Sequence, residues 1–187
     1  MNHETSRQRV EQALGYQFVD VSHLARAMTH ASVAESRAHS YERLEFLGDA
    51  VLGMVVSDSL FRRYPNLLEG EMTKIKSAVV SRQTCASIAR ELGLDGALLL
   101  GKGMTSAGKH SNGRASSLPP SLAAAVFESA LAAIYLDGGF EAVAKVLSPI
   151  IDPLIDKSAL SGHQENFKSV LQQYAQQELR LTPIYRI

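Results

Sequence analysis

Apolar residues recur every three to four positions along most of the chain, which is the spacing of one face of an α-helix. Gly and Pro residues mark the ends of several runs, because they stop a helix or occupy its first turn. A stretch rich in Gly, Ser and Pro over 102–120 is expected to be a loop. The pattern therefore predicts an all-α fold with helices over 5–14, 21–29, 40–63, 69–92, 121–137 and 140–157.

The pattern changes after the last of these helices. A short segment of small, polar residues is typical of a linker. A polar amphipathic helix over 167–180 follows, and residues 181–187 have the pattern of an opening β-strand. One helix and one strand cannot build a core alone. We therefore expect a first domain over 1–158, a linker over 159–166 and the incomplete beginning of a second domain over 167–187.

Composition narrows the class of protein. With 45% hydrophobic and 20% charged residues, the 187-residue chain matches a globular protein and excludes a disordered one. The single cysteine, Cys85, excludes an internal disulfide framework and a cysteine-rich zinc site, and it is expected in the core. The longest apolar stretch, 122–136, is shorter than a membrane span and contains Glu128 and Ser129. We expect a cytoplasmic protein without membrane contact.

Equal numbers of basic and acidic residues, 19 each, give no net charge, so the total does not indicate a strongly basic nucleic-acid binder. The acids are not evenly placed. In the segment YERLEFLGDAV, Glu42, Glu45 and Asp49 fall within roughly 60° of one another on a helix. Three carboxylates on one face repel one another unless water, a cation or basic partners neutralise them. A solvated acidic face remains an equally good interpretation.

A further acid, Glu128, stands in LAAAVFESALAAIYL, where nearly all other side chains are small or apolar. A carboxylate on such a helix is costly to bury unless it is paired, protonated or bound to a metal, and the edge of the helix is the alternative. Carboxylates from two helices would form an oxygen-rich site for Mg²⁺ or Mn²⁺. A di-iron bundle is excluded because it needs Glu-x-x-His pairs, which the sequence lacks.

The segment YERLEFLGDAVL (41–52) closely resembles the signature of ribonuclease III, the double-stranded-RNA endonuclease. The resemblance extends along most of the chain. It includes THAS (29–32), YPNLLEGEMTKIKSAVVSRQT (64–84), LGKG (100–103) and AAVFESALAAIYLDGG (124–139). Residues 167–187 are similar to the start of the double-stranded-RNA-binding domain that follows in bacterial members.

The resemblance implies an all-helical ribonuclease III domain that works as a homodimer. By position, Glu45, Asp49 and Glu128 would bind Mg²⁺, with Mn²⁺ as the alternative, and Asp49 and Glu128 would be catalytic. Glu42 and Glu69 would line the RNA cleft. The implied reaction is metal-dependent hydrolysis of double-stranded RNA to 5′-phosphate products, in the processing of RNA precursors.

Two further sets of residues follow from the resemblance and from charge. Phe46 is similar to the residue that inserts into the partner subunit in family dimers, although an ordinary core phenylalanine is the alternative. Contacts to RNA phosphates need basic side chains, and several Lys and Arg residues are candidates. Each of them can equally be a solvated surface charge. The candidates are Arg62, Arg63, Lys74 and Lys76, with Lys102, Lys109 and Arg114 around the glycine-rich loop.

One position departs from the family pattern. Family members carry Asp-x-x-Glu on the late helix, and here Ala125 stands three residues before Glu128. Alanine offers no oxygen to a cation, so metal binding should weaken unless water fills the position. The alternative function is therefore a catalytically impaired member that binds or scaffolds double-stranded RNA as a dimer. A helical protein–protein module is a third interpretation, and it predicts no salt-dependent affinity for duplex RNA.

Overall fold

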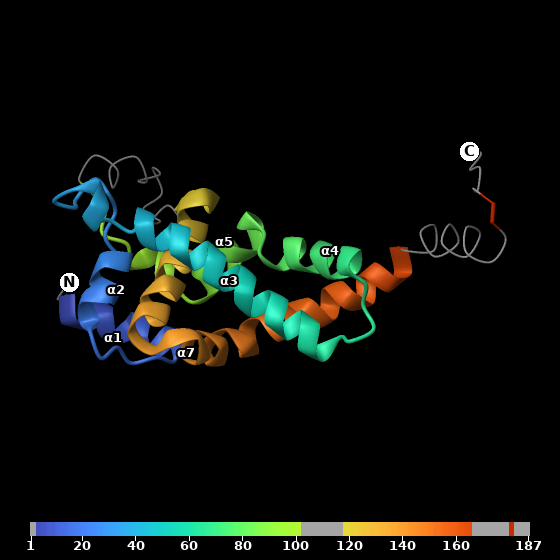
Figure 1. Cartoon of the computed structure of the whole chain (residues 1–187). Helices are drawn as coiled ribbons and strands as arrows, with labels where there is room; N and C mark the ends of the chain where they lie inside the picture. Colours follow the sequence, from blue (N-terminus) through green and yellow to red (C-terminus); the bar gives the residue numbers. More distant parts are fainter. Residues whose placement is uncertain (1–2, 102–117, 166–179, 182–187) are drawn as a thin grey trace.

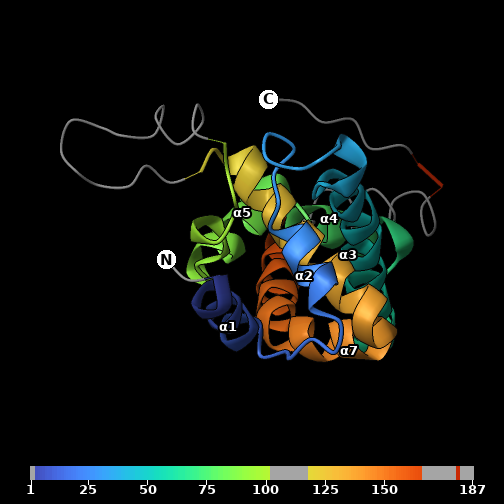
Figure 2. The same cartoon turned by 90° about the vertical axis from the view of Figure 1, so that its left-hand side faces the viewer.

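The computed structural model of the chain describes residues 3–101, 118–165 and 180–181, and within these ranges the all-α prediction is confirmed (Figures 1 and 2). A single β-bridge between Thr29 and Leu99 is the only extended pairing there. The helices are α1 (His3–Leu14), α2 (Val21–Ala27), η1 (Arg37–His39), α3 (Glu42–Arg63), α4 (Glu69–Val79), α5 (Arg82–Glu91), η2 (Leu94–Gly96) and α7 (Pro120–Glu165).

Helix α7 is the centre of the fold. Its first half is apolar on almost every side, so it is buried, and α2, α3, α4 and α5 all pack against it (Figures 1 and 2). Over Pro120–Ser161, α7 is the one helix in the described ranges long and apolar enough to cross a membrane. However, 61% of that apolar window is buried inside the protein, as in the core helix of a globular domain.

A bend at Gly139 divides α7 into two halves, which confirms the two helices predicted over 121–137 and 140–157. Gly139 has φ 75° and ψ −171°, a conformation that only glycine adopts without strain. Next to it, the Asp137 carboxylate accepts hydrogen bonds from the Tyr16 hydroxyl (2.7 Å) and from the backbone N–H groups of Val19 (3.0 Å) and Asp20 (2.7 Å). The bend is thereby tied to the connection between α1 and α2 (Figure 1).

The single helix predicted over 69–92 is wrong, because the chain breaks between α4 and α5. Ser81 is extended (φ −64°, ψ 148°), and its hydroxyl accepts a hydrogen bond from the backbone N–H of Thr84. A serine in this role caps a new helix instead of continuing the old one. Apolar residues recur at helical spacing on both sides of the break, so periodicity alone does not reveal it.

The second half of α7 continues to Glu165, so the segment expected to be a linker, 159–166, is helical up to that residue. Small and polar residues still follow a helix when the preceding turns are already formed. The start of an RNA-binding domain predicted over 167–187 lies outside the described residues, apart from 180–181. The division into two domains stays a prediction.

Candidate active site

The site is built where α3 crosses α7 at backbone contact. A Cβ atom on Gly48 would lie only 1.8 Å from the carbonyl oxygen of Glu128 and 2.4 Å from its carbonyl carbon. Only glycine therefore permits this approach. Glu45 and Asp49 lie three residues before and one residue after Gly48, on the same face of α3. The crossing places them next to Glu128, and we call these three carboxylates the acidic cluster.

The residues around Glu128 fix the orientation of α7. Ser129 is fully buried, and its hydroxyl donates to the carbonyl oxygens of Ala27 at 3.0 Å and Val126 at 2.9 Å, which joins α7 to the end of α2. Glu128 itself is partly buried within an otherwise buried stretch. It makes no ion pair within 4 Å in the part of the chain that the structure describes. Neither an exposed edge nor a buried Arg partner explains it.

The acids of the cluster perturb one another. Burial, followed by the charges of Asp49 and Glu45, raises the pKa of Glu128 to about 7. Burial and the nearby Glu42 also raise the pKa of Glu45. The positive charge of Arg82 opposes both shifts. Such mutual repulsion means that the cluster carries negative charge that the protein itself neutralises only in part.

Cys85 is a second neighbour of Glu128. The side chain is fully buried, which confirms the prediction of a core residue. Its thiol donates a hydrogen bond to the carbonyl oxygen of Val80 at 3.7 Å and lies near the Glu128 carboxylate. Burial, together with the charges of Glu128 and Asp49, raises the pKa of the thiol to about 12. The thiol therefore stays protonated at neutral pH. No signal in the sequence placed Cys85 beside the acids.

The donor set fits a hard divalent cation in its chemistry. The cluster offers only carboxylate oxygens, which are the ligands that Mg²⁺ and Mn²⁺ prefer, and no ion pair within 4 Å occupies them among the described residues. Ala125 lies one turn before Glu128, 3% exposed, and adds no oxygen. As the side chains lie, no three Asp, Glu, His or Cys groups in the described ranges form a closed metal cage.

The two acids expected in an RNA cleft lie at different places. Glu42 is engaged by Arg37, whose guanidinium donates to both carboxylate oxygens at 2.8 and 3.0 Å and lowers the pKa of Glu42. Glu69 begins α4, accepts a hydrogen bond from the Thr73 hydroxyl and borders a cavity of about 480 Å³ between α3 and α4. Their contact with RNA stays a prediction.

Phe46 projects from α3 into solvent with 83% of its surface exposed, so the alternative of a core phenylalanine is wrong. Met54 and Phe61 are exposed on the same helix at intervals of eight and seven residues, which places them on the same side. These three residues form an apolar stripe along α3. The contact of Phe46 with a partner subunit stays a prediction.

Among the candidate phosphate-binding cations, two have structural partners. Arg62 pairs with Asp58 at 2.8 Å, and Arg63 bridges Asp152 at 3.1 Å and Asp156 at 2.6 Å on α7. These pairs brace the end of α3. Of the other candidates, Lys74 is exposed and Lys76 partly buried on α4, while Lys102, Lys109 and Arg114 lie outside the described residues.

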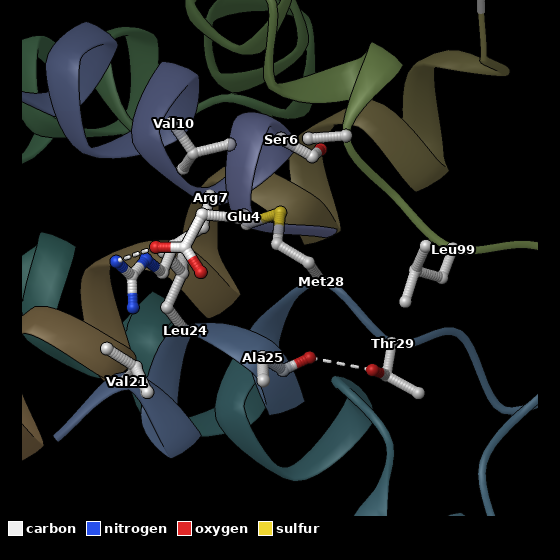
Figure 3. Close-up of a pocket in the computed structure, with 11 residues that line it drawn as sticks. Glu4, Ser6, Arg7, Val10, Val21, Leu24, Ala25, Met28, Thr29 and Leu99 are labelled. Carbon is white, nitrogen blue, oxygen red and sulfur yellow. Dashed lines mark hydrogen bonds and ion pairs between the residues drawn. The ribbon is translucent and has the colours of Figure 1, made fainter. Parts of the chain in front are cut away.

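A pocket of about 270 Å³ between α1, α2 and residues 97–99 lies apart from the acidic cluster (Figure 3). Its walls include the apolar side chains of Val10, Leu24 and Met28. At its edge, Arg7 is paired with Glu4 at 2.8 Å. None of the cluster's carboxylates lines it, so its size does not bear on the chemistry of the crossing.

Comparisons with known proteins agree with the resemblance seen in the sequence. A family described as Ribonuclease-III-like matches residues 20–154. Proteins named Ribonuclease 3 from Rhodopirellula baltica and Oleidesulfovibrio alaskensis are 47% and 39% identical over 96% of the chain. The chain spans 65% and 77% of their lengths. A nuclease domain of ribonuclease III from Campylobacter jejuni, studied for flexibility in a region involved in dimer formation, matches with TM-score 0.67 and 34% identity, over 80% of this chain and 96% of that one.

Proposed function

The chain belongs to the ribonuclease III family, and on that premise we propose that it hydrolyses phosphodiester bonds of double-stranded RNA in the cytoplasm. The products would carry 5′-phosphates, and the substrates would be RNA precursors. The observation that carries the proposal is the crossing at Gly48, which brings Glu45 and Asp49 to Glu128. Duplex RNA is read mainly through shape, phosphates and 2′-hydroxyls, so we expect weak sequence preference.

We propose Mg²⁺ as the cofactor, with Mn²⁺ as the alternative, and Glu45, Asp49 and Glu128 as the residues that would hold it. When bound, a divalent cation stabilises negative charge on a phosphate and lowers the pKa of water. The protein's own contribution is to keep three carboxylates together against their repulsion. The backbone contact at Gly48 does this, because it fixes the helices that carry them.

In this proposal Glu128 acts as a carboxylate ligand. Its pKa of about 7 belongs to the protein without a metal, and binding of a divalent cation would release the proton and favour the carboxylate. The protonated Cys85 thiol lies beside that carboxylate and adds no charge to the acidic cluster. Asp49 is exposed and faces solvent, from which the RNA strand would approach.

We further propose that the protein acts as a homodimer through the apolar stripe of Phe46, Met54 and Phe61. An exposed row of large apolar side chains is typical of a protein–protein contact. A two-fold axis would place the same stripe of each copy against the other. Each subunit would then cut one strand. The related nuclease domain from Campylobacter jejuni has a region involved in dimer formation, which supports this arrangement.

A catalytically impaired member that binds or scaffolds double-stranded RNA is the second candidate function. The observation that favours it is the buried Ala125, one turn before Glu128, which contributes no oxygen to the acidic cluster. Both functions share the dimer and the RNA. They differ only in whether three carboxylates suffice for hydrolysis.

The two candidates separate in one experiment. The protein and its Ala125→Asp variant are incubated with long duplex RNA and Mg²⁺, beside Glu128→Gln as an inactive control. Cleavage by both proteins supports the enzyme and excludes the scaffold. Cleavage by the Asp variant alone identifies an inactivated enzyme. Cleavage by neither, with a folded dimer and salt-dependent RNA affinity, supports the scaffold, whereas a lack of such affinity contradicts both.

A further inference from the structure

We propose that Arg82 binds a backbone phosphate of the RNA strand that lies against the acidic cluster. The inference deepens the proposed function and rests on it, since it assumes that duplex RNA is the ligand. Arg82 was not among the cations that the sequence singled out. Its effect on Glu45 and Glu128 distinguishes it from Lys74 and Lys76. Among the described residues it also lacks the ion pairs that hold Arg62 and Arg63.

The start of α5 places Arg82 beside the cluster. Ser81 caps the helix, so Arg82 is its first residue, and Cys85 follows three positions later on the same face. Cys85 is fully buried and close enough to Glu128 for each side chain to perturb the pKa of the other. This proximity shows which face of α5 is turned towards the acids. Arg82 lies on this face one turn nearer the helix end, where its side chain is exposed.

Arg82 affects the charge of the acidic cluster without forming an ion pair with it in the described residues. Its positive charge opposes the rise in the pKa values of both Glu45 and Glu128. Yet it makes no ion pair within 4 Å and no hydrogen bond to a side chain in residues 3–101 or 118–165. Arg37 and Arg63, by contrast, are held by carboxylates. The guanidinium of Arg82 thus keeps donors available for a ligand.

A phosphate is the ligand that this arrangement fits. A guanidinium presents parallel N–H donors that match two phosphate oxygens. The positive end of the α5 helix dipole points the same way. RNA that approaches the acidic cluster meets three carboxylates that repel it, so a cation at the same edge is needed to hold the strand there. Because Ala125 removes one acid, a single arginine offsets a larger share of the remaining charge.

The alternative role for Arg82 is that of a counter-ion that only relieves repulsion within the cluster. The two roles differ in salt dependence. Each phosphate contact adds about one unit to the slope of log affinity against log salt, whereas a purely internal counter-ion adds nothing. Binding is measured with the full chain and a fluorescent RNA duplex in EDTA, so that catalysis does not enter the result.

The variants are Arg82→Ala, Arg82→Lys and, as a matched control, Lys157→Ala. Lys157 is exposed and follows Asp156, which binds Arg63 at the far end of α3, so the same charge is removed away from the cluster. We expect Arg82→Ala to weaken binding about tenfold at moderate salt and to lower the slope by about one unit. Arg82→Lys should keep the slope but bind about threefold less tightly, because it loses the paired donors. Lys157→Ala should match the unmodified protein.

The outcomes separate this inference from the proposed function. If Arg82→Ala and Arg82→Lys bind with the affinity and slope of Lys157→Ala, the role of Arg82 is overturned while RNA binding stands. If the unmodified protein shows no salt-dependent affinity, both are overturned. Thermal unfolding of each variant identifies any loss of fold. Should Arg82→Ala unfold, the charge-conserving Arg82→Lys variant still decides, because a counter-ion role predicts no change in its RNA affinity.

Discussion

Gly48→Ala should damage both the fold and the site, because the added methyl group meets backbone and not a movable side chain. The new Cβ would lie 1.8 Å from the carbonyl oxygen of Glu128. Ordinary carbon–oxygen contacts are about 3.3 Å or longer, so α3 and α7 must separate by about 1.5 Å. No rotamer change relieves this clash.

The magnitude follows from two opposing effects. Overpacking a closely packed contact costs about 1–3 kcal/mol and occasionally more. Replacing a helical glycine by alanine returns about 1 kcal/mol of helix propensity. Because the clash is with backbone, the upper range applies, and the net loss should be about 2 kcal/mol. For a domain of this size that corresponds to a fall in Tm of about 4–8 °C.

Gly53→Ala is the matched control on the same helix. Its Cβ would lie 3.5 Å from Cε of Lys76, an ordinary contact with a flexible side chain. We expect Gly53→Ala to be as stable as the unmodified protein or up to about 1 kcal/mol more stable. Thermal and urea unfolding followed by circular dichroism measure both variants. Equal stability of Gly48→Ala and Gly53→Ala would refute the backbone contact at the crossing.

A catalytic measurement extends the test. A displacement of about 1 Å at an active site lowers rates about 100-fold, so Gly48→Ala should lose cleavage to at least this extent under conditions where it remains folded. Gly53→Ala should retain it. If Gly48→Ala folds less stably but cleaves normally, the spacing between Glu45, Asp49 and Glu128 is not set by the crossing.

Three further predictions concern charge, assembly and the bend of α7. Folding raises the pKa of Glu128 from 4.5 to about 7, so between these pH values the folded protein holds a proton that the unfolded chain has lost, and stability falls as pH rises. In EDTA the Tm should therefore fall over this window, and Glu128→Gln should abolish most of that fall. Phe46→Ser should raise the dimer dissociation constant at least about 30-fold in analytical ultracentrifugation, with Val19→Ser, at a 91% exposed side chain, showing no effect. Asp137→Ala should cost about 1–3 kcal/mol in urea unfolding, and Tyr16→Phe, which removes one of three hydrogen bonds, clearly less.

Local features of the fold were predictable because they depend on local sequence. The shared face of Glu45 and Asp49 follows from helical spacing, and the apolar surroundings of Glu128 follow from composition. The end of α1 was equally clear from Gly15, which has φ 63°. In each case a few neighbouring residues decide the structure, so the pattern and the fold agree.

The remaining features depend on contacts between distant segments. Gly48 is one glycine inside a helix, and nothing around it indicates that another backbone passes at this point. The position of Cys85 and Arg82 beside Glu128 depends on the break at Ser81, which periodicity conceals. Phe46 is an aromatic residue on a largely apolar helix, yet its side chain is exposed. Only the packed structure distinguishes these cases.

The crossing of α3 and α7 also governs when the protein becomes functional during its synthesis. Asp49 and Glu128 are about 80 residues apart, so a ribosome adding about 5–20 residues per second needs about 4–16 s to make the intervening chain. Until then, the buried side of α3, including Val55 and Val56, has no α7 to cover it. A nascent chain therefore exposes apolar surface that favours aggregation before its acidic cluster is complete. Substitutions that slow the docking of α7 should lower the yield of soluble protein before they lower the activity of the molecules that fold.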